Sequence, residues 1–164
     1  MRLVLDASVC LKWFLPEHAH EPDSGSAFAL LEDVRSEKIR LIQPPVWHSE
    51  IAAVLARILP RHAQQMIDEL FHLSIDIDAG EIILRSAVNL ASRRDHHLFD
   101  TIYHAVAIEH ATTLVTADTR YYRKAQSLGH ITLLSQWRST RISETPEKYT
   151  VGASKRRAPR QTRR

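Results

Sequence analysis

The stretch LFDTIYHAVAIEHATTLVTADTRYYRKA, residues 98–125, decides the fold. Apolar residues recur at helical spacing in its first half, which predicts a helix over 98–110. Its second half contains TTLVT, residues 112–116, a β-branched and apolar run that predicts a buried strand ending just before Asp118. A helix that leads directly into a buried strand is typical of an α/β fold.

The same alternation of strands and helices extends over most of the chain. Further strands are expected at 2–5, 39–42, 74–78 and 131–134, and further helices at 23–36, 45–59, 61–72, 79–93 and 119–128. Residues 7–22 contain Pro16 and Pro22 and are expected to form a loop. We therefore predict an α/β fold, a three-layer α/β/α sandwich with a mainly parallel central sheet.

Length and composition suit one compact domain with a real core. The chain has 164 residues, of which 44% are hydrophobic and 25% charged. Its single cysteine, Cys10, excludes an intrachain disulfide and fits a reducing cytosol, so a cytoplasmic location is expected. No signal-peptide pattern precedes Asp6, and no apolar run approaches the roughly 20 residues needed to span a bilayer.

Charge is divided unevenly along the chain. The regular spacing of apolar residues ends near Arg138, so we expect a folded domain over 1–137 and a polar, basic extension over 138–164. Residues 155–164 hold six basic and no acidic side chains; of 22 basic and 19 acidic residues, 16 basic and 19 acidic remain elsewhere. Such a tail is typical of a contact with a polyanion, and a solubilising end is an equal alternative.

Four carboxylates occupy notable positions. Asp6 and Asp118 each follow an apolar strand directly, and the carboxyl ends of parallel strands meet at one edge of a sheet. Glu50 and Asp100 lie within mainly apolar helical segments. Each has a simpler reading by itself, as a turn or cap residue or, for Glu50, a solvated helix residue. The inference therefore depends on their combination.

A cluster of these four acids would need a counter-charge. At roughly 6 Å and an effective dielectric of about 20, each pair repels by about 3 kcal/mol, and six pairs would approach ~20 kcal/mol. Because a whole domain is stable by only about 5–15 kcal/mol, the cluster must take up protons or bind cations. Oxygen ligands favour Mg²⁺ or Mn²⁺, whose water ligands can attack a phosphodiester. The sequence thus points to metal-dependent phosphodiester hydrolysis.

Other catalytic chemistries find less support. Cys10 has no evident base nearby in the sequence, and no GxSxG motif occurs. An α/β phosphatase or receiver domain with an aspartyl nucleophile would place a second Asp two residues after Asp6, where Ser8 stands.

The acidic segments resemble the motifs of the PIN-domain ribonucleases, and among them the VapC-like toxins of type II toxin–antitoxin systems. The resemblance covers residues 2–134 and is carried by LVLDASVCLKWFLPE (3–17), PPVWHSEIAAVL (44–55) and the stretch 98–125. It implies that 1–137 is a nuclease domain that binds Mg²⁺ or Mn²⁺ and cleaves RNA internally. It also implies an antitoxin partner and a homodimer. A catalytically inactive PIN-like domain that binds RNA or protein is the alternative.

The resemblance assigns roles to individual residues. Asp6, Glu50, Asp100 and Asp118 match the catalytic acids, with Asp6, Asp100 and Asp118 as the metal ligands. Ser8 and Thr116 match hydroxyl positions that orient carboxylates, although both fit ordinary turn or strand residues as well.

Two positions depart from the family pattern. Tyr121 and Tyr122 stand where some members carry a further acid, so one metal ion is expected rather than two. His104 replaces an apolar residue four positions after Asp100, on the same helix face, which makes it a candidate proton carrier or phosphate contact; a packed histidine is the favoured alternative. His96 and His97 are interpreted as loop residues.

Basic side chains near the acidic positions are candidates for RNA contacts, because Arg and Lys neutralise phosphates. The candidates are Lys12, Arg94, Arg120 and Arg123.

Overall fold

Five parallel strands form one sheet in the part of the chain that the computed structural model describes, residues 1–15 and 23–137. They are β1 (Arg2–Leu5), β2 (Arg40–Gln43), β3 (Ile75–Ile77), β4 (Leu114–Thr116) and β5 (Ile131–Leu133). Their spatial order is β3-β2-β1-β4-β5, and every neighbouring pair is parallel. The predicted α/β fold with a parallel sheet is confirmed.

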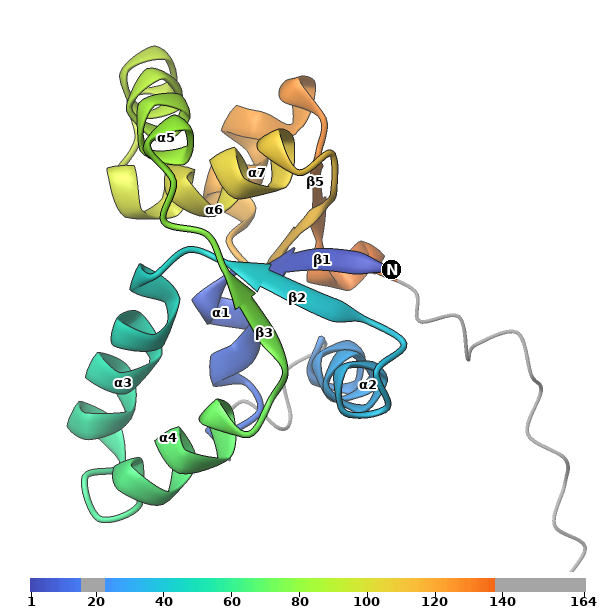
Figure 1. The fold of residues 1–164 in the computed structure, drawn as a ribbon, viewed down its shortest axis with the longest axis vertical. Coiled ribbons are helices and arrows are strands. Elements are labelled where there is room, and N and C mark those ends of the chain that lie inside the picture. The colour runs from blue at the N-terminus through green and yellow to red at the C-terminus, as the bar shows by residue number, and fades with distance from the viewer. Residues whose placement is uncertain (16–22, 138–164) are drawn as a thin grey trace, which may run out of the picture.

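Helices cover both faces of this sheet (Figure 1). One side carries α1 (Ala7–Leu11), α2 (Ser24–Arg35), α3 (Val46–Ile58) and α4 (Ala63–Phe71). The other side carries α5 (Glu81–Arg94) and α6 (Leu98–Glu109), and α6 contacts β1, β2 and β4. Helix α7 (Thr119–Ala125) contacts β5, and the short 3₁₀ turns η2 (Gln126–Leu128) and η3 (Leu134–Gln136) follow it.

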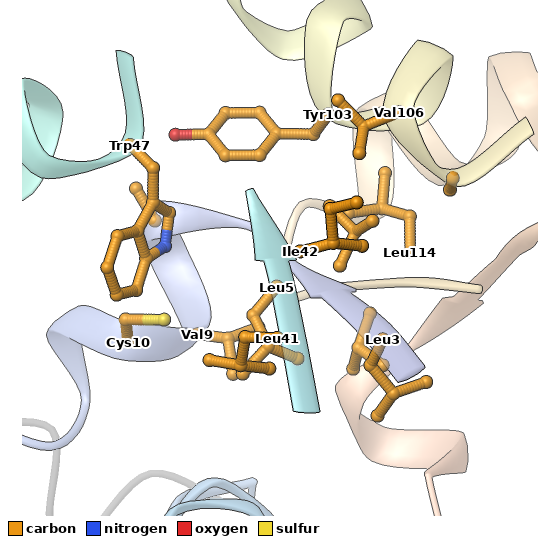
Figure 2. Packing of buried hydrophobic residues seen from close by; sticks show 14 of the residues in the cluster. Leu3, Leu5, Val9, Cys10, Leu41, Ile42, Trp47, Tyr103, Val106 and Leu114 are labelled. Carbon is orange, nitrogen blue, oxygen red and sulfur yellow. The ribbon is translucent and has the colours of Figure 1, made fainter. Parts of the chain in front are cut away.

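The core lies along β1 and the strands β2 and β4 on either side of it. Leu3, Val4 and Leu5 of β1 are fully buried, as expected for a parallel strand covered on both faces. Figure 2 shows Tyr103 and Val106 on one side of the strands and Val9 and Cys10 of α1 on the other. This packing fixes the carboxyl ends of β1 and β4, which lead directly into Asp6 and Asp118.

The expected loop over 7–22 is wrong for residues 7–11, which form α1. Asp6 caps this helix, since its Oδ1 accepts the Ser8 backbone N–H at 2.9 Å. Five residues are too few to show helical periodicity, and α1 is held by packing against α3 and β4. Residues 16–22 of the expected loop lie outside the described residues.

The predicted extension over 138–164, including the basic tail, also lies outside the described residues, so the domain boundary at 137 stays a prediction. Among the helices of the described ranges, none combines the length and apolar character required to cross a membrane.

Candidate active site

Asp6 lies at the ends of the neighbouring strands β1 and β4. It follows β1, whose Leu5 pairs with Val115 of β4. Its Oδ1 accepts the Ser8 backbone N–H at 2.9 Å, and its Oδ2 accepts the Thr116 hydroxyl at 2.6 Å. The carboxylate is therefore fixed by one hydrogen bond from the segment that follows β1 and one from β4.

The hydroxyls of Ser8 and Thr116 also reach the backbone that leads into Asp118. Thr116 Oγ1 accepts the Asp118 N–H at 3.0 Å, and Ser8 Oγ accepts the Ala117 N–H at 3.3 Å. Thr116 thus donates to one acid while it accepts from the backbone of another. The contacts bring both hydroxyls to the segments that carry Asp6 and Asp118, and the role of Ser8 and Thr116 in orienting metal ligands stays a prediction.

Asp118 caps α7. Its Oδ1 accepts the backbone N–H groups of Arg120 at 2.7 Å and Tyr121 at 3.0 Å. Its Oδ2 has no hydrogen bond from the described residues. The cap sets the direction of the side chain and leaves one carboxylate oxygen for a ligand.

Asp100 lies in the first turn of α6, opposite Asp118. Its Oδ2 is 3.0 Å from Nε2 of His96, and His96, Asp100 and Asp118 each offer a ligand atom within 4.8 Å of the other two. His96 belongs to the loop between α5 and α6, as interpreted from the sequence, but its ring faces the acids. Helix spacing could not have identified it, because His96 lies two residues before α6 begins.

Glu50 reaches the same region from α3, on the other side of the sheet. Its Oε2 accepts a hydrogen bond from the Tyr103 hydroxyl of α6. Burial raises the pKa of Glu50, the Tyr103 hydrogen bond opposes this shift, and repulsion from Asp6 and Asp100 adds to it. Tyr103 was missed from the sequence, although its position three residues after Asp100 places both on one helix face.

The charges of the cluster are coupled. Burial also raises the pKa of Asp6, the hydrogen bonds from Thr116 and Ser8 oppose it, and Asp100 raises it further. Asp6 and Glu50 therefore carry a negative charge less readily than exposed carboxyl groups do, and the charge of Asp100 acts on both. Asp118 lies close to Asp100.

The donor set fits a divalent cation. Carboxylate oxygens suit Mg²⁺ and Mn²⁺. The buried Nε2 of His96 makes no hydrogen bond in the described part of the chain, although it lies 3.0 Å from Oδ2 of Asp100. In the described part of the chain, His96, Asp100 and Asp118 bring ligand atoms within 4.8 Å of one another and could hold such an ion, whereas Asp6 and Glu50 lie outside this group.

His104 does not present a free ring nitrogen to the acids. It is fully buried, its Nδ1 is 3.0 Å from the Tyr121 hydroxyl, and its Nε2 is 2.8 Å from the Gly129 carbonyl. Burial lowers the pKa of His104, which keeps the ring neutral near pH 7. These contacts favour the packed-histidine alternative.

The predicted RNA contacts differ in exposure. Lys12 is only 7% exposed, which leaves it little surface for a phosphate. Arg120 and Arg123 are exposed on α7, and Arg94 is partly exposed, with a long contact of 3.5 Å to Ser127. Arg120 lines a surface cavity of about 280 Å³ together with His96. Arg120 is therefore the basic candidate that shares a cavity with His96, whose ring contacts Asp100.

Comparisons with known proteins identify the family and similar folds. A model of the PIN domain family matches residues 3–127. A search of curated proteins finds no match.

Solved structures share the fold at low sequence identity. A chain from a toxin–antitoxin complex of Klebsiella pneumoniae is 14% identical, with a TM-score of 0.59 over 82% of this chain and 98% of that one. A chain of FitAB bound to a DNA fragment is 19% identical, with a TM-score of 0.58 over 85% and 99%. FitAcB from Neisseria gonorrhoeae is 20% identical, with a TM-score of 0.54 over 81% and 96%. Because the family model covers most of the folded domain, and the acids stand where parallel strands end, this chain belongs to the PIN domain family.

Proposed function

We propose that the protein is a metal-dependent endoribonuclease, and that it is the toxin of a toxin–antitoxin pair. The observation that supports the proposal is that Asp100 and Asp118 bring carboxylate oxygens within 4.8 Å of each other, while the charge of Asp100 also raises the pKa values of Asp6 and Glu50. A bound Mg²⁺ or Mn²⁺ would supply positive charge and an activated water for phosphodiester hydrolysis.

Each acid has a task in this proposal. Asp6, Asp100 and Asp118 hold the cation, with Thr116 and Ser8 fixing the direction of the Asp6 carboxylate. Glu50 is suited to proton transfer, because its raised pKa brings it closer to neutral pH than an exposed glutamate. Arg120, which lines a cavity with His96, contacts an RNA phosphate in this proposal.

The nuclease proposal is tested by cleavage of a fluorescent single-stranded RNA, with a DNA of the same sequence beside it. Asp100→Asn and Asp118→Asn should abolish Mg²⁺- or Mn²⁺-dependent cleavage while the proteins stay folded. Asp68→Asn, an exposed position on α4, is the matched control and should cleave as the wild type does. Full cleavage by either active-site variant, or by the wild type in excess EDTA, would refute the proposal.

The toxin role, the antitoxin partner, homodimerisation and a cytoplasmic location belong to the same proposal. The family resemblance supports them, as does the likeness to a chain from a toxin–antitoxin complex. Expression without a neighbouring antitoxin should arrest bacterial growth, and the Asp6→Asn variant should not. Equal growth of both strains, at equal protein levels, would instead favour a PIN-like domain that binds RNA or protein without cutting.

A further inference from the structure

His96 has a buried side chain whose Nε2 makes no hydrogen bond within the described residues. This side chain is 6% exposed. A buried nitrogen without a partner is unfavourable, so such atoms normally face a ligand or a water. The atoms nearest to Nε2 include the Asp100 carboxylate, at 3.0 Å.

The ring of His96 packs against α7, and its backbone leads into α6. Tyr121 of α7 packs against it with a centroid distance of 4.7 Å and an interplanar angle of 33°. His97, the next residue, is the N-cap of α6. His96 thus contacts α7, whose N-cap is Asp118, and comes directly before the N-cap of α6, whose first turn contains Asp100.

The resulting group of atoms has the size of a metal site. One nitrogen of His96 and one oxygen each of Asp100 and Asp118 lie within 4.8 Å of one another. Metal–ligand bonds of about 2.1 Å place two ligands at most about 4.2 Å apart, so small side-chain rotations would close the group around one ion. The set offers one nitrogen and two oxygens.

We propose that His96 is a nitrogen ligand of the divalent cation shared by Asp100 and Asp118, and that it makes the site prefer a first-row transition ion such as Mn²⁺ to Mg²⁺. Mg²⁺ binds oxygen ligands almost exclusively, whereas imidazole is a common ligand of transition ions. The inference rests on the proposed function in one respect, that the acids bind a cation. It adds a ligand and a selectivity that four carboxylates alone do not provide.

The competing explanation is an ion pair between a protonated His96 and Asp100. That arrangement would satisfy the same 3.0 Å contact without any metal–nitrogen bond. The two explanations predict different EPR spectra of a bound paramagnetic ion, because only a coordinated imidazole places ¹⁴N next to the ion.

The experiment uses the full chain, freed of metal, with Mn²⁺ as the probe. Mn²⁺ affinity is measured from the EPR signal of the free ion, Mg²⁺ affinity by competition, and nitrogen coordination by pulsed EPR of the bound ion. The variants are His96→Gln and, as the matched control, His97→Gln, which removes the exposed neighbouring imidazole. Urea denaturation establishes that both variants are folded.

The wild type and His97→Gln should show ¹⁴N coupling to Mn²⁺, and His96→Gln should not. Mn²⁺ affinity should fall by about tenfold or more in His96→Gln, since even the loss of a residue that only orients a metal ligand typically costs that much. Mg²⁺ affinity should change by less than about threefold, because Mg²⁺ gains little from the imidazole.

Two failures are distinguishable. If the wild type binds Mn²⁺ without ¹⁴N coupling, or His96→Gln keeps the wild-type affinities, the assignment of His96 is wrong and the nuclease proposal stands. If the wild type binds neither ion, the proposed metal site itself is wrong. Should His96→Gln fail to fold, the wild-type spectrum alone decides whether nitrogen is coordinated.

Discussion

Replacing Asp100 by asparagine should stabilise the metal-free protein while it removes the response to metal. Asp100 and Asp118 offer oxygens within 4.8 Å, and the Asp100 side chain is 40% exposed. Two unit charges at this distance repel by about 3.5 kcal/mol at a dielectric of 20 and by about 1 kcal/mol in water. Partial exposure places the repulsion at about 1–2 kcal/mol.

Two smaller effects act in opposite directions. Asp100 also raises the pKa values of Asp6 and Glu50, so its removal relieves those pairs as well. Against this, a negative charge in the first turn of α6 is favourable by about 0.5 kcal/mol, which the asparagine loses. We therefore expect Asp100→Asn to raise the free energy of unfolding by about 1–2 kcal/mol at pH 7.5 in EDTA.

The assay is urea denaturation followed by tryptophan fluorescence, in EDTA and in saturating Mn²⁺. Wild type should gain stability from Mn²⁺ by mass action, and Asp100→Asn should gain little. Asp68→Asn should follow the wild type in both buffers. The reasoning is refuted if Asp100→Asn is less stable than the wild type in EDTA, or if it keeps the full Mn²⁺ response.

The pH dependence gives a second readout of the same cluster. Because the folded-state pKa values of Asp6 and Glu50 are raised, the folded protein binds more protons than the unfolded chain just above pH 4. In the metal-free wild type, Asp6 and Glu50 should therefore stabilise the fold at low pH. This contribution to the unfolding free energy should be lost as pH rises through their raised pKa values. The fall should be smaller in Asp100→Asn.

Three further predictions concern the groups around the acids. Thr116→Val removes the hydroxyl that donates to Asp6, so it should lower the unfolding free energy by about 1–3 kcal/mol and raise the pKa of Asp6. Urea denaturation measures the first effect and NMR titration the second, and an unchanged Asp6 titration would contradict the prediction. Tyr103→Phe keeps the ring but removes the donor to Glu50, so the pH of half-maximal Mn²⁺ binding should move upward, and a downward shift would count against the assignment. The pKa of His104 is lowered by burial, so wild type should lose up to about 1.4 kcal/mol per pH unit as pH falls below about 6.5, when the unfolded chain takes up the proton first. In His104→Gln this slope, measured by urea denaturation between pH 7.5 and 5.5, should diminish, and an identical slope would refute the role of His104.

Local sequence patterns were sufficient for the positions of Asp6 and Asp118. Each follows a short apolar strand, and a buried parallel strand has a simple signature because both of its faces are covered. The strand ends then place the acids without knowledge of any distant contact. The same holds for Asp100, whose helix is apolar on most sides.

Features that depend on how helices dock were not predictable in this way. Helix α1 is too short for a periodic signal, and the burial of Lys12 depends on the packing around it. The contact of Tyr103 with Glu50 joins residues 53 apart in the sequence, and the partner of His104 at Gly129 is 25 residues away. Gly129 adopts a φ of 73°, a conformation that other residues rarely take, and only the folded chain shows that its carbonyl faces a histidine.

The hydrogen bond between Thr116 and Asp6 has a consequence for synthesis of the protein. It joins residues 110 apart, because β4 is inserted beside the first strand of the chain. Contacts of such long range form late, after the intervening segment has been made. A ribosome that translates this chain therefore carries an incomplete acidic cluster until β4 has emerged and paired. Under the proposed activity, the nascent enzyme would be harmless to the messenger RNA that encodes it until most of the domain has been made.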